Sequence, residues 1–407
     1  MTGRVVLGVS GGIAAYKACE LLRRFTESGH DVTVVPTAAA LRFVGAPTWA
    51  ALSGKPVSTD VWDHVHEVPH VRIGQAADLL VFAPATADVL AKAAHGLADD
   101  LLTNTLLTAR CPVVFAPAMH TEMWEHPATQ ANVALLRSRG AVVIEPAEGR
   151  LTGVDTGKGR LPDPDEIFAL ATDLLARAEH GREVLQDLTG WHVVVSAGGT
   201  REYLDPVRFL GNRSSGLQGY ALARTAAARG ASVTLVAANV TLPDPAGVKV
   251  VRVETTAQLR DAVLEASAAA DAVVMAAAPA DFRPVQEAEA KIKKADDGSV
   301  PDLRLAQNPD ILAGLASERP NERIVVVGFA AETGDESGSV MEHAAAKLAR
   351  KGCDLLVVND VGGGAVFGAE DNEAVVLGSD GSSVAVPRGS KAALAHVIWD
   401  QVLARRG

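Results

Sequence analysis

The sequence predicts an α/β protein of two domains, the first of which is a doubly wound parallel sheet. Short apolar runs alternate with helical stretches along the N-terminal half, a pattern typical of strands that helices cover on both faces. The chain has 407 residues, which is more than one domain of ordinary size contains. Alanine, valine and glycine dominate, and aromatic residues make up only 4%. This composition favours packed α/β layers over an aromatic-rich β-sandwich.

The N-terminal half contains a series of continuous apolar runs that we expect to be strands. They are Val5–Val9, Val32–Val35, Leu79–Ala83, Val113–Ala116 and Val142–Ile144. Helical stretches such as Ala14–Glu27 and Thr129–Arg139 lie between them. The glycine-rich stretch Glu148–Asp165 has little apolar periodicity, and we interpret it as a mobile loop or flap. A further helix is expected near Glu166–Ala178.

The polar stretch Glu179–Thr189 is the expected boundary, giving domains of residues 1–180 and 190–407. A second α/β series follows, with a hairpin at Glu373–Val386 and a closing helix at Lys391–Arg405. Its expected strands are His192–Ser196, Ser232–Ala237, Ala272–Ala276, Ile324–Gly328 and Asp354–Val358.

The two halves echo each other, since both Val5–Gly12 and Val193–Gly199 are a strand followed by a glycine turn. Internal duplication and the general likeness of α/β domains both explain this echo, and the choice stays open. Either explanation predicts two nucleotide-type crevices, one at the carboxyl ends of the strands in each half.

Charge and composition exclude several classes of function. The formal net charge is -11, with 48% hydrophobic and 21% charged residues, which argues against wholesale disorder and against a protein that coats nucleic acid. No apolar run reaches the roughly 18 residues that a membrane span needs. Cys19, Cys111 and Cys353 are too far apart in the sequence for a disulfide framework or a CxxC zinc site. We therefore expect a cytoplasmic protein that binds neither nucleic acid nor membranes.

Three predicted strands of the N-terminal half end in turns that suit a ligand. Ser10–Lys17 is a glycine turn followed by a helix start, where backbone N–H groups can bind a phosphate, although a plain βα turn is the alternative. Pro84–Asp88 and Pro117–His120 close two other strands at the same edge. Thr86 and His120 would therefore share one crevice, unless Thr86 only caps its helix.

Two other motifs match known sites only in part. His66–His70 has the letters of the zinc-protease motif HExxH, but Pro69 disrupts the helix that would bring both histidines to one face. A single functional histidine is the favoured interpretation of this segment. Gly153–Gly159 resembles a P-loop, but it is one residue short and has glycine where Ser or Thr would hold Mg²⁺. The sequence therefore assigns no metal ligands.

Polar and basic residues gather at the strand ends of the second half. Asn212–Gly216 is a polar turn that ends in glycine before a helix, an arrangement suited to bind an anion. Lys347 and Lys351 lie four residues apart on a predicted helix, so both can face one crevice. The basic run Lys291–Lys294 would by itself indicate a solvated surface. Together these groups favour a polyphosphate site.

Taken in order, these motifs resemble those of the bifunctional phosphopantothenoylcysteine decarboxylase / phosphopantothenate–cysteine ligase of bacterial coenzyme A synthesis. The likeness covers essentially the whole chain. The segments that carry it are Ser10–Lys17, Pro84–Asp88, Pro117–Met119, Asp205–Arg208, Asn212–Gly216, Lys291–Lys294, Asn308–Ile311 and Gly328–Thr333. The resemblance implies a flavodoxin-like N-terminal domain that binds FMN, followed by a Rossmann-like α/β ligase domain that uses CTP with Mg²⁺.

The resemblance also implies two successive reactions. The ligase would cytidylylate the carboxylate of 4′-phosphopantothenate, and the amine of cysteine would then displace CMP. The decarboxylase would oxidise the product's thiol with FMN and release CO₂, and the reduced flavin would then return a hydride to give 4′-phosphopantetheine. N-terminal trimers and C-terminal dimers would combine into a homo-oligomer, a dodecamer.

Residue by residue, His70 matches the active-site base of the decarboxylase. In the ligase half, Asn212 matches the asparagine associated with the acyl-cytidylate, and Lys291 is expected to neutralise charge in the transition state. FMN contacts are expected at Ser10, Gly11, Gly12, Ile13, Thr37, Ala85, Thr86 and Ala87. CTP contacts are expected at Met275, Ala276, Ala277, Asp281, Lys291, Asn308, Pro309, Asp310, Ile311, Phe329, Lys347 and Lys351.

Two positions depart from the family pattern. His120 stands where asparagine is common, and the flap lacks the usual cysteine, with Thr152 nearest to its expected position. A threonine hydroxyl is a far weaker acid than a thiol, so Thr152 is a poor substitute as proton donor. Asp155 and a bound water are further candidates. We hypothesise that His120, or a water that it orients, donates the proton.

The missing cysteine motivates an alternative function. In that alternative the chain is a ligase only, and its N-terminal domain is a flavin-binding scaffold without decarboxylase activity. A third interpretation is a regulatory protein that binds a nucleotide or a flavin and catalyses nothing.

Overall fold

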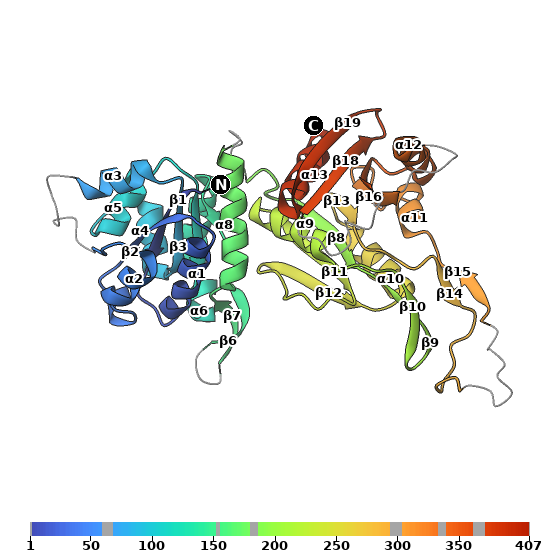
Figure 1. Cartoon of the computed structure of the whole chain (residues 1–407), viewed down its shortest axis with the longest axis horizontal. Helices are drawn as coiled ribbons and strands as arrows, with labels where there is room; N and C mark the ends of the chain where they lie inside the picture. The colour runs from blue at the N-terminus through green and yellow to red at the C-terminus, as the bar shows by residue number, and fades with distance from the viewer. Residues whose placement is uncertain are drawn as a thin grey trace. The chain divides into compact units, whose positions relative to one another are not determined.

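The computed structural model describes residues 2–58, 68–151, 155–179, 186–293, 303–332, 339–360 and 371–406. The chain divides into two compact units (Figure 1). One unit comprises Met1–Asp187 with Pro245–Gly247, and the other comprises Leu188–Asp244 with Val248–Gly407. The point of division lies within the polar stretch Glu179–Thr189, of which residues 180–185 lie outside the described part.

The N-terminal unit contains a five-stranded parallel sheet in the order β2-β1-β3-β4-β5. Its strands are β1 Arg4–Val9, β2 Asp31–Pro36, β3 Leu79–Ala85, β4 Val113–Pro117 and β5 Val142–Val143. This is the order of a flavodoxin-like doubly wound sheet, in which the direction of winding reverses between β1 and β3. All the strands expected in this half are therefore confirmed.

Helices cover both faces of this sheet. They are α1 Ala15–Glu27, η1 Ala40–Arg42 (a 3₁₀ turn), α2 Ala46–Ser53, α3 Pro69–Ala76, α4 Ala87–His95, α5 Leu101–Thr108, α6 Thr121–Glu125, α7 Pro127–Ser138 and α8 Pro164–Glu179. Leu22 of α1 and Ile167 of α8 pack in the core on one face, and Leu90 of α4 and Leu102 of α5 pack in the core on the other. Every residue of β3 is buried in consequence, which explains its continuous apolar run.

One expectation for the N-terminal half is wrong. The segment Glu148–Asp165, interpreted as a loop, contains an antiparallel ribbon of β6 Ala147–Arg150 and β7 Thr156–Arg160. Glycines and charged residues alternate in both strands, so no apolar pattern marks them. A Cβ on Gly159 would lie 2.2 Å from the carbonyl oxygen of Met119, so only glycine lets β7 pack this closely.

The C-terminal unit contains an eight-stranded sheet in the order β12-β11-β8-β13-β16-β17-β18-β19. Its strands are β8 His192–Gly198, β11 Ser232–Ala238, β12 Val248–Val253, β13 Ala272–Met275, β16 Val325–Glu332, β17 Leu355–Asp360, β18 Asp371–Gly378 and β19 Ser383–Ser390. The strands from β12 to β17 are parallel and follow the Rossmann order, with the reversal between β8 and β13. The expected hairpin is confirmed as β18 and β19, which pair antiparallel.

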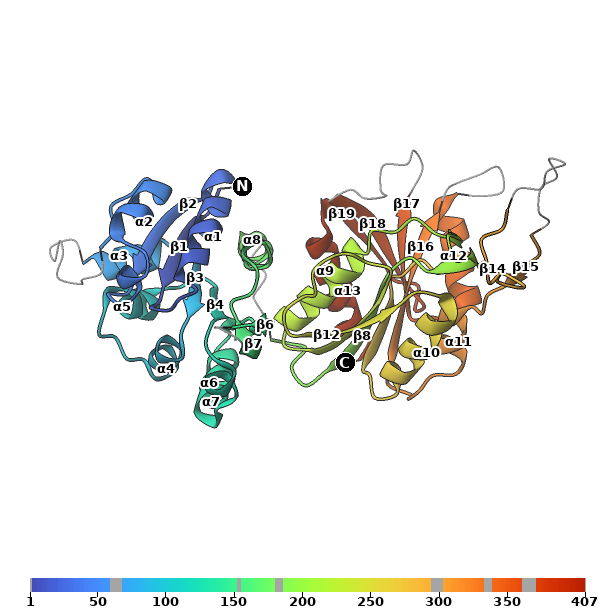
Figure 2. The ribbon, with the colours of Figure 1, turned by 90° about the horizontal axis from the view of Figure 1, so that it is seen from below.

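Helices α9 and α13 cover one face of this sheet, and α10, α11 and α12 cover the other (Figure 2). Their bounds are α9 Leu217–Ala228, α10 Thr256–Ser267, α11 Ile311–Ser317, α12 Val340–Lys351 and α13 Lys391–Ala404. Tyr220 of α9 and Trp399 of α13 are fully buried in the core of the first face. Leu259 and Leu348 belong to the core of the second face.

Two short ribbons and the edge strand β12 were not predicted from the sequence. Strands β9 Arg201–Asp205 and β10 Arg208–Gly211 form one ribbon, and β14 Phe282–Pro284 and β15 Leu305–Gln307 form the other. Both ribbons lie outside the main sheet, and β14 packs beside β9. Strands β10, β14 and β15 are short and largely exposed, and β9 is short with polar residues at its buried positions, so the ribbons lack the continuous apolar runs that reveal buried strands.

Candidate functional site

In the N-terminal unit, the candidate site lies at the reversal between β1 and β3. The hydroxyl of Ser10 donates a hydrogen bond of 2.6 Å to the carbonyl oxygen of Pro84 and accepts one of 2.9 Å from the backbone N–H of Thr86. Thr86 in turn caps α4, because its hydroxyl accepts from the N–H of Val89. The structure therefore brings the glycine turn and the start of α4 together.

The other predicted FMN contacts lie at the same edge of the sheet. A Cβ on Gly11 would lie 2.4 Å from the Cβ of Ala39, so this turn has room only for glycine. Thr37 follows β2, and its N–H donates 2.9 Å to the carbonyl oxygen of Val9 at the end of β1. Ile13 is 68% exposed at the start of the α1 region. Gly12 belongs to the same turn, Ala85 ends β3, and Ala87 begins α4.

His70 is the second residue of α3. Its Nδ1 is buried and has no hydrogen-bond partner among the described residues, while its carbonyl oxygen accepts 2.8 Å from the hydroxyl of Thr108. A Cβ on Gly74 would lie 2.6 Å from the carbonyl oxygen of Thr105, so α3 packs tightly against α5. The imidazole therefore sits on a fixed helix with one ring nitrogen available. His66 and Glu67 of the HExxH pattern lie outside the described residues.

His120 precedes α6 and lies next to the ribbon β6–β7. The N–H of Met119 donates 2.9 Å to the carbonyl oxygen of Gly159, which places the residues before α6 beside β7. The side chain of His120 is exposed. Within the described part of the chain, neither His70 nor His120 is hydrogen-bonded to the Ser10–Thr86 pair. Thr152 lies outside the described residues.

An ion-pair cluster anchors the ribbon to the rest of this unit. Glu145, which follows β5, pairs with Lys158 of β7 at 2.5 Å and with Arg137 of α7 at 2.8 Å. Burial raises the pKa of Glu145, but hydrogen bonds from Lys158 and Arg137 outweigh it and lower the pKa below its usual value. The carboxylate therefore stays ionised and holds β7 in place.

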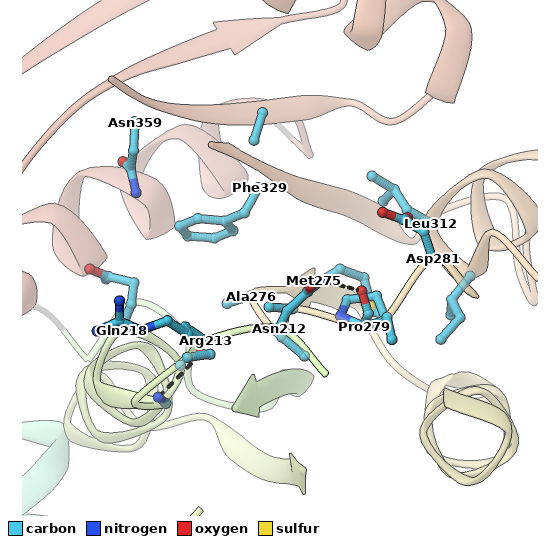
Figure 3. A pocket seen from close by; sticks show the side chains of 18 of the residues that line it. Asn212, Arg213, Gln218, Met275, Ala276, Pro279, Asp281, Leu312, Phe329 and Asn359 are labelled. Carbon is cyan, nitrogen blue, oxygen red and sulfur yellow. Dashed lines mark hydrogen bonds between the residues drawn. The ribbon is translucent and has the colours of Figure 1, made fainter. Parts of the chain in front are cut away.

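In the C-terminal unit, a cavity of about 800 Å³ opens at the carboxyl ends of β8, β13, β16 and β17 (Figure 3). All predicted ligase residues except Lys291 line it. They are Asn212, Met275, Ala276, Ala277, Asp281, Asn308, Pro309, Asp310, Ile311, Phe329, Lys347 and Lys351. Phe329 and Asn359 face Asn212 and Pro279 from the opposite wall of the cavity.

Amide side chains fix the loop that follows β13. The Nδ2 of Asn212 donates 2.7 Å to the carbonyl oxygen of Pro279. Asn308 binds the loop twice, because its Nδ2 donates 2.9 Å to Ala280 and its N–H donates 2.8 Å to Asp281, both at carbonyl oxygens. The loop that carries Asp281 is therefore held from two sides, as a preformed binding site requires.

Basic side chains line the same cavity. Lys347 and Lys351 come from α12, as the four-residue spacing predicts, and Lys351 forms an ion pair with Asp310. Burial raises the pKa of Asp310, but the Lys351 ammonium and the N–H of Ala313 lower it further than burial raises it. Asp310 also caps α11.

Several other polar residues line the cavity and were not individually predicted from the sequence. They are Arg213, Gln218, Arg350, Asn359, Asn372 and Lys391. Arg213 lies in the polar turn, and Arg350 precedes Lys351, so proximity to the motifs could have indicated these two. Asn372 and Lys391 come from segments with no recognisable motif. The Oδ1 of Asn359 is buried and finds no hydrogen-bond partner in the part of the chain that the structure describes, which leaves it available to a ligand.

Lys291 is exposed and does not line the cavity. It lies in the segment after β14, and Lys294 and Thr333 of the neighbouring motifs lie outside the described residues. The described ranges contain no group of three or more His, Cys, Asp or Glu side chains that could hold a metal ion. No described helix is long and apolar enough to cross a membrane.

Comparison with known proteins identifies the family. The model of the DNA/pantothenate metabolism flavoprotein C-terminal domain matches residues 188–405, and the Flavoprotein model matches residues 2–176. The coenzyme A biosynthesis bifunctional protein CoaBC of Mycobacterium tuberculosis (strain ATCC 25618 / H37Rv) is 60% identical over 406 residues, 98% of this chain and 96% of that protein. Its namesake from Bacillus subtilis (strain 168) is 42% identical over 404 residues, again 98% of this chain and 96% of that protein. The chain therefore belongs to the family of bifunctional coenzyme A biosynthesis proteins.

Proposed function

We propose that the two units of this chain catalyse successive steps of coenzyme A biosynthesis. The C-terminal unit ligates 4′-phosphopantothenate with cysteine in a CTP-dependent reaction that passes through an acyl-cytidylate and forms CMP. The N-terminal unit then decarboxylates 4′-phosphopantothenoylcysteine to 4′-phosphopantetheine with FMN. The observation that carries this proposal is the cavity at the Rossmann reversal, which gathers the predicted ligase residues in one unit while His70 and Ser10 lie in the other.

In the ligase site, the cavity offers the charges that a nucleoside triphosphate and a phosphorylated acid need. Lys347, Lys351, Lys391 and Arg213 supply positive charge, and the start of α9 supplies backbone N–H groups to a phosphate. Mg²⁺ bound together with CTP would offset the charge of the polyphosphate. Asn212 orients the acyl-cytidylate, and Lys291 neutralises the charge that develops as the carboxylate attacks the α-phosphate.

In the decarboxylase site, the strand ends of the N-terminal unit fit FMN. The turn at Gly11 packs tightly against Ala39 just before α1, where helix-start N–H groups suit a phosphate, and the buried Nδ1 of His70 has no hydrogen-bond partner among the described residues. Ser10, Thr37 and Thr86 would hold the flavin, which supplies two-electron oxidation and reduction when bound. His70 acts as the base. His120, or a water that it orients, donates the final proton, and the ribbon β6–β7 beside it excludes bulk water.

We also propose that the chain works in the cytoplasm as a homo-oligomer built from N-terminal trimers and C-terminal dimers, a dodecamer. Its three cysteines are free, which suits a reducing compartment. Each unit exposes large apolar side chains: Ile13 and Tyr16 in the first, Val207 and Phe209 in the second. Light scattering coupled to gel filtration measures the assembly directly.

One assay tests the proposed reactions. The purified chain is incubated with CTP, Mg²⁺, 4′-phosphopantothenate and cysteine, and CMP, CO₂ and 4′-phosphopantetheine are quantified. We expect all three products, and we expect visible flavin bands in the absorption spectrum of the protein. Ligated product without CO₂ would support the ligase-only alternative, and binding without any product would support a regulatory role. Neither alternative finds support in relatives that match the whole chain and are named as bifunctional proteins.

A further inference from the structure

The motif Asp205–Arg208 makes contacts that have no role in the reactions proposed above. Asp205 ends β9 and Arg208 begins β10, so both lie at the turn of that hairpin. The N–H of Ile292 donates 3.2 Å to a carboxylate oxygen of Asp205, and the guanidinium of Arg208 donates 2.6 Å to the carbonyl oxygen of Ile292. Both backbone polar groups of Ile292 are therefore bound by one side-chain pair, which we call the Asp205–Arg208 clamp.

The clamp is rigid because several hydrogen bonds hold the carboxylate of Asp205 in place. Asp205 is 0% exposed, and its carboxylate also accepts from the N–H groups of Val207 at 2.8 Å and Arg208 at 2.9 Å. The Arg208 guanidinium pairs with the same carboxylate at 2.6 Å. Burial raises the pKa of Asp205, but these hydrogen bonds outweigh burial and lower the pKa to about 2. The carboxylate is thus permanently charged near neutral pH.

The contacts with Ile292 exceed what the hairpin itself requires. The bonds from Asp205 to Val207 and Arg208 close the turn locally, whereas Ile292 lies 87 residues from Asp205 in the sequence. A further bond of 3.0 Å, from the N–H of Ala288 to the carbonyl oxygen of Leu204, holds the same segment against β9. The hairpin therefore holds a segment that is distant in the sequence in a fixed register.

That segment carries Lys291, the residue directly before Ile292. Arg208 lies four residues before Asn212, which lines the ligase cavity, and four residues span at most about 14 Å. The clamp therefore fixes the backbone of Lys291 close to the cavity although the lysine side chain does not line it. A long, flexible lysine that acts on a transition state gains from a fixed backbone, since a misplacement of about 1 Å can cost on the order of 100-fold in rate.

We propose that Asp205, acting with Arg208, is a positioning residue that fixes the backbone of Lys291 for the ligation step. The proposal rests on the proposed ligase function and on the role of Lys291 in it. Asp205 is proposed to touch neither CTP nor the acyl group. It acts only through the segment that carries Lys291.

A double-mutant cycle tests whether Asp205 acts through Lys291. Ligation is measured for Asp205→Asn, Lys291→Gln and the double variant, with kcat and the KM for CTP determined separately. We expect Asp205→Asn to lower kcat on the order of 10–100-fold with the KM for CTP unchanged, and to cause no further loss in the Lys291→Gln background. Losses that multiply in the double variant would overturn the proposal. A normal rate for Lys291→Gln alone would instead refute the proposed role of Lys291, and the two failures are therefore distinguishable.

Tryptic cleavage after Lys291 gives a readout that does not depend on activity. Asp205→Asn should accelerate cleavage at this bond in the native protein, and unchanged cleavage would overturn the clamp. Asp380→Asn is the matched control, because Asp380 also accepts from a backbone N–H, that of Ser382, and from an arginine, Arg405. If Asp205→Asn does not fold, Arg208→Lys replaces it throughout, since a lysine cannot bind the carboxylate and the Ile292 carbonyl in the same planar arrangement.

Discussion

The hydroxyl of Ser10 donates a 2.6 Å hydrogen bond to the carbonyl oxygen of Pro84, 74 residues away in the sequence. The hydroxyl oxygen of Ser10 in turn accepts from the N–H of Thr86, so one buried side chain joins the end of β1 to the end of β3. These two strands flank the reversal in the sheet order, where a doubly wound fold binds its ligand. Ser10 is therefore a structural as well as a binding element of the proposed FMN site.

Replacing Ser10 by alanine should weaken FMN binding. The variant leaves the N–H of Thr86 without its acceptor, which costs on the order of 1–3 kcal/mol. If this whole cost weakens FMN binding, the affinity for FMN falls roughly 5–150-fold. Flavin absorbance of the purified variant and titration with FMN measure the effect. Ser138→Ala on the surface of α7 serves as the control, and full flavin content in Ser10→Ala would contradict the assignment.

Replacing His70 by alanine should abolish CO₂ release and leave ligation intact. His70 belongs to α3 of the N-terminal unit, whereas the ligase cavity belongs entirely to the C-terminal unit. CO₂ and CMP formation are followed in the same sample, with the exposed His95→Ala as the control. An equal loss of CMP formation in a folded His70→Ala protein would show that the two activities are not divided between the units.

Replacing His120 by asparagine should stall the decarboxylase after CO₂ loss. An asparagine amide cannot donate a proton as an imidazolium can, so 4′-phosphopantetheine should fail to appear while an oxidised product accumulates. Rapid-quench product analysis measures both species. Thr152→Val should have a milder effect. If Thr152→Val stalls and His120→Asn stays active, the proton donor is the hydroxyl of Thr152 and not His120.

Replacing Lys291 by glutamine should lower CTP-dependent ligation by at least ~100-fold. Loss of one charged donor to a transition state has an effect of this size. Steady-state CMP release gives the rate, and Lys249→Gln on the edge strand β12 is the control for loss of an exposed lysine. Near-normal turnover of Lys291→Gln would show that the basic run Lys291–Lys294 is only a solvated surface.

Replacing Glu145 by glutamine should destabilise the N-terminal unit at neutral pH. Ion pairs with Lys158 and Arg137 lower the pKa of Glu145 in the folded state despite burial, so their contribution is present above the ordinary value of 4.5 and is lost as pH falls through the folded pKa. We expect a loss of about 1–3 kcal/mol at pH 7. Thermal unfolding across pH measures it, and the difference from the native protein should shrink below pH 4.5.

The exposed pair Arg23–Glu27 provides the control for this prediction. Both of its side chains are more than half exposed, and such pairs contribute about 0.3–0.5 kcal/mol. Glu27→Gln should therefore change the unfolding temperature little at any pH. A constant difference between Glu145→Gln and the native protein from pH 7 to pH 3 would contradict the ion-pair explanation.

The buried strands, most helices and much of the candidate site could be predicted from local patterns in the amino-acid sequence. Buried parallel strands are continuous apolar runs, so β1, β3 and β13 were visible without knowledge of their partners. Helical spacing likewise placed Lys347 and Lys351 together, because residues four apart share a helix face. These features depend on local periodicity, which a single sequence displays.

Features that depend on contacts between residues distant in the sequence could not be predicted in this way. The ribbon β6–β7 has no apolar pattern and forms because Gly159 lets it pack against Met119. The Asp205–Arg208 clamp joins a hairpin to Ile292, and no periodicity indicates a contact across 87 residues. Such contacts depend on the tertiary arrangement, because folding brings together residues that no local pattern relates.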